Sequence, residues 1–119
     1  MNHFITLKEA VAMTTLYRNN KEIILASDVT PNTLVNSESF TRGDIDKVLA
    51  QPDCTGIRVY YGMDELLRVH AILVGFDQNN HDLVGSGGMG AGLEDDDPKI
   101  LDKGTRCPDE CPPPSPLNP

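Results

Sequence analysis

Two cysteines near the carboxyl end of the chain carry the most suggestive chemistry in the sequence. Cys107 and Cys111 are separated by three residues in the stretch CPDECPPPSP, and a proline directly follows each of them. Thiolates two to four residues apart are typical of structural zinc sites, but a closed site needs two more ligands. The remaining cysteines and histidines are Cys54, His3, His70 and His81. The same spacing also permits a small disulfide ring, which requires an oxidising site or a redox role.

The prolines of this stretch favour a third interpretation, which concerns conformation instead of bond chemistry. Pro112, Pro113, Pro114 and Pro116 follow the second cysteine. Prolines favour an extended polyproline-type segment whose ordering costs little entropy. Such segments dock on aromatic-lined surfaces of their own domain or of another chain. We therefore interpret 107–119 as a proline-rich tail that packs on a surface, and keep metal binding and a disulfide as alternatives for Cys107 and Cys111.

A second set of candidate residues lies in a stretch with the alternation of a β-strand. Apolar and polar side chains alternate from Ile57 to Tyr61, and the run LLRVHAILVGF after GMDE is rich in β-formers. We expect an antiparallel hairpin over 56–76, centred on Asp64, with Tyr61 opposite Leu67. A slip of one residue would reverse the face of every side chain.

This pairing predicts a compact cationic and aromatic patch on one face of the hairpin. Its members are Arg58, Tyr60, Arg68 and His70. Arginine pairs bind carboxylates and phosphates in a bidentate way, and tyrosine adds stacking area and a hydroxyl. The patch is a candidate ligand or partner site, and the alternative is an ordinary solvated strand face. As an enzyme site it would use His70 for acid–base chemistry and the arginines as anchors for a small anionic metabolite.

Other motifs in the sequence lack features that the sites they suggest would require. Gly85–Gly90 matches G-x-G-x-x-G, but a dinucleotide site needs a helix after it, and here the carboxylates of Glu94–Asp97 follow and would oppose a pyrophosphate. We expect 85–98 to be a flexible glycine-rich and acidic loop. Asp77–Asp82 lacks the glycine and late glutamate of a calcium loop and is interpreted as a turn. No local motif links a nucleophile to a base, so the sequence leans against an enzyme.

Two helices and two short strands are expected around the hairpin. Thr6 and Glu9 have the spacing of a capping box, which predicts a helix that reaches Asn20 or continues towards Leu25. Thr41 is the expected cap of a second helix that stops before Pro52. The two short strands are expected at Leu83–Val84 and Ile100–Leu101.

Composition limits the classes of partner. The chain has 119 residues and a formal net charge of −8; residues 1–50 contribute five Lys/Arg against six Asp/Glu, and residues 51–119 five against twelve. An acidic surface repels phosphate backbones and anionic membranes, so we expect neither nucleic acid nor membrane as a partner. With neither an apolar span nor a signal segment, the expected compartment is the cytoplasm. Its reducing conditions favour free thiols unless the cysteines bind metal or have a redox role.

Two blocks of the sequence carry a resemblance to a known family. These are SESFTRGDIDKVLAQPDCTGIRVYYGMDELLRVHAILVG and KGTRCPDECPPPSPLN. Together they resemble an uncharacterised family of short bacterial proteins with a G-x-R-x-Y-x-G-M-D-E hairpin and a C-P-x-x-C-P-P tail. The family has no assigned activity, so the resemblance implies no catalytic or binding residue. It implies only that hairpin and tail occur together, which favours a tail packed on the domain.

These observations predict a small acidic α+β protein, with two N-terminal helices packed on an antiparallel sheet built around the 56–76 hairpin. Residues 1–106 are expected to form one domain, and 107–119 the tail. The leading functional hypothesis is a non-catalytic protein-interaction module without a cofactor, whose partner is another protein or a second copy. The alternatives are a metal- or redox-linked protein using Cys107 and Cys111, and a small enzyme or binder of an anionic metabolite at the hairpin patch.

Overall fold

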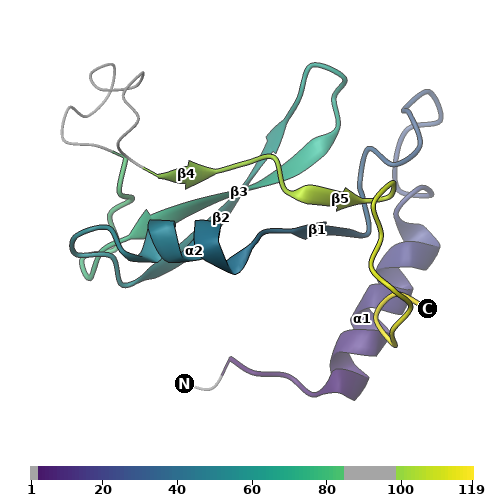
Figure 1. Ribbon diagram of the computed structural model, residues 1–119. Coiled ribbons are helices and arrows are strands. Elements are labelled where there is room, and N and C mark those ends of the chain that lie inside the picture. Colours follow the sequence, from purple (N-terminus) through teal and green to yellow (C-terminus); the bar gives the residue numbers. More distant parts are fainter. Residues whose placement is uncertain (1–2, 85–98) are drawn as a thin grey trace. The chain divides into compact units, whose positions relative to one another are not determined.

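The computed structural model describes residues 3–84 and 99–119, and Figure 1 shows its helices and strands. The chain divides into two compact units, each of which is described by itself. The first combines Met1–Ser37 with Arg106–Pro119, and the second is Glu38–Thr105. The predicted flexible loop 85–98, including its G-x-G-x-x-G match, lies outside the described residues.

Helix α1 (Leu7–Asn20) belongs to the first unit and begins as predicted. The Thr6 hydroxyl accepts a hydrogen bond from the backbone N–H of Glu9 at 3.0 Å, and the Glu9 carboxylate accepts one from the Thr6 N–H at 3.1 Å. These two bonds satisfy orphan donors of the first turn. The helix does not continue towards Leu25, because the N–H of Ile23 bonds to the Asn20 carbonyl at 3.0 Å and begins a turn.

Helix α2 (Arg42–Leu49) belongs to the second unit and also has its predicted cap. The Thr41 hydroxyl accepts a hydrogen bond from the backbone N–H of Asp44 at 3.3 Å. The helix ends at Leu49, with Ala50 as its C-cap, ahead of the proline at 52. It packs against the neighbouring sheet, and its Val48 side chain is fully buried. The predicted packing of a helix on the hairpin sheet is therefore found for α2.

The predicted hairpin forms the centre of the second unit. Strands β2 (Gly56–Met63) and β3 (Val69–Phe76) pair antiparallel, and β4 (Ile100–Leu101) pairs with the other edge of β3 in a three-stranded sheet (Figure 1). The predicted register is wrong, because Tyr61 lies opposite Ala71 and not opposite Leu67.

The register differs because the turn is centred on Leu66, two residues further along the chain than the expected centre at Asp64. The Asp64 carboxylate accepts hydrogen bonds from the backbone N–H groups of Leu66 (2.8 Å) and Arg68 (3.1 Å). The Asp64 N–H also donates to the Arg68 carbonyl at 3.1 Å, which closes the turn. The partner of each β2 residue therefore moves by an even number of positions along β3, and every side chain keeps its predicted face while it changes its neighbour.

Three-residue strands add a second, two-stranded sheet that the sequence did not predict. It pairs β1 (Ser37–Ser39) with β5 (Thr105–Cys107). The short strand at Ile100–Leu101 is confirmed, whereas Leu83–Val84 is not a strand. Only a single bridge between Phe76 and Asp82 forms there.

The structure confirms a small α+β fold with antiparallel sheets. The described buried apolar side chains of the second unit are Val48, Leu73 and Val74. Within the described ranges, no helix is long and apolar enough to cross a bilayer. The core is small, which leaves many apolar side chains of the hairpin at the surface.

Candidate functional site

The predicted patch on the hairpin is divided between two separate clusters of polar side chains. In the first cluster, the Arg58 guanidinium donates hydrogen bonds to the side chains of Asp82 and Asn80, and the Tyr60 hydroxyl donates to the other oxygen of Asp82. Arg58 also stacks over the ring of Phe76, with 4.8 Å between Cζ and the ring centroid. These residues come together because β2 places Arg58 and Tyr60 on one face and the turn after β3 brings Asp82 back over it.

Three residues of this first cluster, Arg58, Tyr60 and Asp82, determine its protonation. The hydrogen bond from Tyr60, together with the Arg58 guanidinium, lowers the pKa of the Asp82 carboxyl below its ordinary value. The same hydrogen bond raises the pKa of the Tyr60 hydroxyl, because ionising it would place two negative charges side by side. At neutral pH the cluster therefore holds an ionised carboxylate between a guanidinium and a neutral phenol.

The second cluster lies at the turn and is centred on Asp64. One Asp64 oxygen, Oδ2, accepts a hydrogen bond from Arg68 Nε at 2.9 Å and lies 2.7 Å from His70 Nε2. The other His70 nitrogen lies 3.7 Å from an oxygen of Asp102, which follows β4. The hydrogen bond with His70, supported by Arg68 and the turn N–H groups, lowers the pKa of Asp64 far below its ordinary range.

These contacts change what the predicted patch can do. Arg58 and His70 do not lie opposite each other, and neither do Tyr60 and Arg68. Each arginine is paired with a carboxylate of the same unit, so neither guanidinium offers an uncompensated charge to an anionic ligand. The geometry therefore gives no support to an anionic-metabolite site, which stays a prediction.

The other face of the hairpin carries a surface that sequence reasoning missed. Val59, Tyr61 and Met63 alternate along one face of β2, and Leu66 and Leu67 follow in the turn. All five side chains are exposed, and the exposed fractions of Tyr61 and Met63 reach 78% and 63%. We call these five residues the apolar hairpin surface. The alternation of these side chains is visible in the sequence. Whether the core covers this face cannot be told from the sequence.

One residue of this surface also has an unfavourable backbone. Leu67 has a φ of 64°, in the left-handed region that favours glycine or asparagine. Its side chain is 64% exposed. Neither local conformation nor burial within the described structure accounts for a leucine here, and such a residue is a reason to look for a function.

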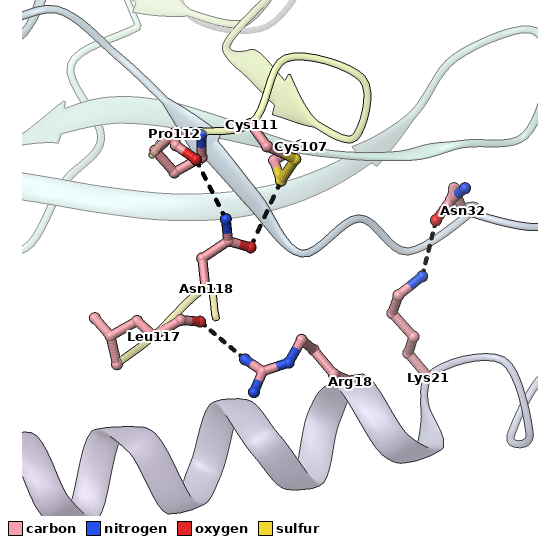
Figure 2. The surroundings of a disulfide bond; sticks show 8 residues. All are labelled: Arg18, Lys21, Asn32, Cys107, Cys111, Pro112, Leu117 and Asn118. Atoms are coloured by element: carbon pink, nitrogen blue, oxygen red, sulfur yellow. Dashed lines mark hydrogen bonds between the residues drawn. A yellow bond between two sulfur atoms is a disulfide. The ribbon is translucent and has the colours of Figure 1, made fainter. Parts of the chain in front are cut away.

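The C-terminal residues form a compact cluster in the first unit, shown in Figure 2. Cys107 and Cys111 are joined by a disulfide with their Cα atoms 4.5 Å apart. Cys107 is buried to 1% exposure and its Sγ lies 3.9 Å from Asn118 Oδ1, whereas Cys111 is exposed. Cys54, in the other unit, is a free thiol.

The tail packs on its own unit, although it is not extended throughout. Arg18 of α1 donates a hydrogen bond to the Leu117 carbonyl at 2.8 Å, and the Asn36 N–H donates to the Cys107 carbonyl at 2.7 Å (Figure 2 shows the first of these). Ser115 and Asn118 exchange two backbone hydrogen bonds, of 3.1 and 2.9 Å, and fold the end back. The prolines therefore lead into a turn instead of forming one straight segment.

Two further observations concern ligands. In the described part of the chain, no group of three or more His, Cys, Asp or Glu side chains could hold a metal ion. An open polar hollow of about 360 Å³ lies beside the start of β2, lined by Asp53, Cys54, Thr55, Asp77, Gln78 and Asn79. It contains none of the residues predicted for the hairpin patch or the tail.

Comparison with known proteins adds no assignment: no protein-family model, curated protein or solved structure matches the chain.

Proposed function

We propose that the protein is a small non-catalytic protein-interaction module that binds through the apolar hairpin surface. The observation that carries this proposal is the exposure of five apolar or aromatic side chains along β2 and in the turn that follows it: Val59, Tyr61, Met63, Leu66 and Leu67. Exposed apolar side chains are common singly, but a group of them on adjacent positions marks a contact site. Tyrosine and methionine are also enriched in the centres of protein interfaces.

The polar clusters support this function by holding the hairpin in shape. Asp64 fixes the turn from which Leu66 and Leu67 project, because its carboxylate accepts the turn N–H groups and binds Arg68. Asp82 holds Arg58 and Tyr60 on the opposite face. A binding surface on such a rigid scaffold loses little conformational entropy when a partner docks.

A photo-crosslinking experiment tests the proposal. A photoreactive phenylalanine derivative replaces Tyr61, and in a matched control it replaces His81, which is exposed on the turn after β3. In cells, the probe at 61 is expected to give specific cross-links to protein, including a second copy, and the probe at 81 far fewer. If position 61 gives no cross-link above the level of position 81, the proposed function is contradicted.

The disulfide favours a second candidate, thiol–disulfide exchange at the C-terminal cluster. A thiolate of a dithiol reductant would attack the exposed Cys111 Sγ and form a mixed disulfide, and the Cys107 sulfur would leave as a thiolate. The second thiol of the reductant would then displace Cys111, so that the reductant is oxidised and both cysteines become thiols. Attack at Cys107 is blocked by its burial.

Single-cysteine variants of the tail test this candidate. Cys107→Ser leaves Cys111 as the tail thiol, and Cys111→Ser leaves Cys107. With oxidised glutathione, mass spectrometry should show faster mixed-disulfide formation in Cys107→Ser than in Cys111→Ser, because only Cys111 is accessible. Equal rates, or faster reaction at Cys107, would exclude the proposed direction of attack.

A further inference from the structure

We propose that strand β2 is a dimer interface, along which two copies of the protein pair antiparallel with Tyr60 on the two-fold axis. This inference rests on the proposed function, because it names the partner of the apolar hairpin surface as a second copy. It follows from the hydrogen-bonding direction of β2, the pattern of its side chains and the distribution of charge along it.

The backbone of β2 offers one edge for pairing. Its register with β3 and the bond from the Asp64 N–H to the Arg68 carbonyl show that even-numbered residues bond to β3. The odd-numbered residues therefore direct their N–H and C=O groups away from β3; they are Ile57, Val59, Tyr61 and Met63. Within the described ranges, no strand pairs with this edge, so an eight-residue strand presents a full row of backbone donors and acceptors.

At the opposite edge of the hairpin, the backbone groups have partners within the fold. There the outward backbone groups of β3 are taken up along its length: Leu73 pairs with Leu101, and the Gly75 carbonyl accepts from the N–H of Leu83 at 2.8 Å. The Ala71 N–H donates to the Glu38 carboxylate at 2.8 Å. The fold thus covers one edge of the hairpin and leaves the other for an intermolecular strand.

The side chains of β2 are complementary to themselves in an antiparallel pair centred on Tyr60. Ile57 then lies opposite Met63 of the second copy, and Val59 opposite its Tyr61. Both pairs join residues whose N–H and C=O groups point outward, so each pair can exchange two hydrogen bonds. All of these side chains lie on one face and form a continuous apolar row across the two copies, which is the packing that stabilises neighbouring strands.

Charge is compatible with this pairing although the protein is acidic. Arg58 is the only charged residue in β2, and in the proposed register it lies opposite Gly62 of the second copy. Its guanidinium is already paired with Asp82. The strand contains no lysine or proline, the residues that commonly prevent edge-to-edge pairing. A second copy therefore meets a mainly apolar strand whose one charged side chain, Arg58, is already paired with Asp82.

A pair of double variants tests the interface. Val59→Lys with Tyr61→Lys places two lysines opposite each other in both symmetric pairs, whereas Val59→Glu with Tyr61→Lys places a glutamate opposite a lysine. We expect sedimentation equilibrium to show a dimer for the wild type and for the Glu/Lys variant. The Lys/Lys variant should dissociate, with the dimer dissociation constant raised about a hundredfold or more. Circular dichroism verifies that each variant is folded.

A cysteine cross-link tests the register. Tyr60 would face itself across the axis in a pair that does not exchange hydrogen bonds, where the Cα atoms approach to about 4.5 Å, close enough for a disulfide. Mild oxidation of Tyr60→Cys should therefore give a covalent dimer. Met63→Cys is the matched control, because position 63 faces Ile57 of the second copy and lies far from its own equivalent, so this variant should not cross-link.

The outcomes separate this inference from the function on which it rests. A wild type that is monomeric throughout the concentration series, or cross-linking of Met63→Cys as efficient as that of Tyr60→Cys, would overturn the dimer. If the monomeric protein still gives photo-cross-links from position 61 to another protein, the interaction module stands and only the choice of partner is wrong. If position 61 gives no cross-link either, both proposals fail.

Discussion

Asp64 and Asp82 each hold one arginine of the hairpin, and this pairing determines what its polar face can do. The carboxylates lie within the same unit as Arg58 and Arg68 and neutralise them. A face that looks cationic in the sequence is therefore close to neutral in the structure. At the residue scale, the two arginines therefore stabilise the hairpin and are not available to bind a ligand through an unpaired charge.

The low pKa of Asp64 predicts a specific dependence of stability on pH. A carboxyl whose pKa is lower in the folded state stabilises the fold above its unfolded value, and this contribution is lost as pH falls through the folded pKa. Asp64→Asn keeps an oxygen for the turn N–H groups but loses the charge that Arg68 and His70 contact. The variant should melt below the wild type near pH 6, and the difference should shrink as pH falls below the ordinary value of 3.8. A difference that stays constant with pH would contradict this role of the charge.

Two glycines give a matched pair of packing predictions. A Cβ at Gly75 would lie 2.8 Å from the Cys54 sulfur and 3.3 Å from atoms of Gln51 and Leu83, so Gly75→Ala should destabilise the protein by about 1–3 kcal/mol. A Cβ at Gly43, in the first turn of α2, meets no atom within 4 Å. Gly43→Ala should therefore stabilise by up to about 1 kcal/mol. Urea unfolding measures both, and the idea fails if the two substitutions have the same sign.

At the scale of elements, the turn of the hairpin is the feature that sequence pattern described least well. Helix caps depend on residues three apart, so Thr6 and Thr41 could be identified directly. The hairpin strands were predictable from alternation and β-propensity. Their register was not, because it depends on how the Asp64 carboxylate captures the N–H groups of Leu66 and Arg68.

In the candidate site, too, features set by neighbouring residues could be predicted, whereas contacts between residues distant in the sequence could not. The partner of Arg58 and Tyr60 is Asp82, which lies on the turn after β3, and no local spacing points to it. The exposure of Tyr61 depends on how much of the sheet α2 and its flanking residues cover, which is a property of packing. Sequence reasoning therefore found the polar residues of the hairpin but not the carboxylate that pairs with Arg58, nor the exposure of the apolar face.

The backbone of Leu67 gives a prediction at this scale. Leu67→Gly removes the steric cost of a φ of 64°, partly offset by the greater freedom of glycine in the unfolded chain. The net effect should be a gain of roughly 0.5–1 kcal/mol in thermal or urea unfolding. The same variant should weaken cross-linking from position 61, because it removes an exposed apolar side chain. A loss of stability would mean that the leucine packs within the fold.

At the scale of the whole molecule, the division into two compact units predicts that reduction of the disulfide affects one unit and not the other. The disulfide, Arg18 and Asn36 all belong to the first unit, and the hairpin belongs to the second. Closing a ring as small as Cys107–Cys111 contributes about 2 kcal/mol in the chain-entropy description. Reduction should therefore speed hydrogen exchange at the Asn36 N–H, which bonds to the Cys107 carbonyl. Amides between β2 and β3 should exchange at unchanged rates. If their exchange is accelerated as much as that of the Asn36 amide, the two units unfold together.

The bond from Arg18 to Leu117 joins residues 99 positions apart, because the first unit is made from both ends of the chain. This division has a consequence for synthesis. A ribosome releases the N-terminal segment first, yet that segment lacks its packing partner until residues 106–119 emerge. The second unit is continuous and can fold while translation continues. Helix α1 therefore lacks the contacts of this segment, such as the hydrogen bond from Arg18 to the Leu117 carbonyl, until residues 106–119 have been synthesised.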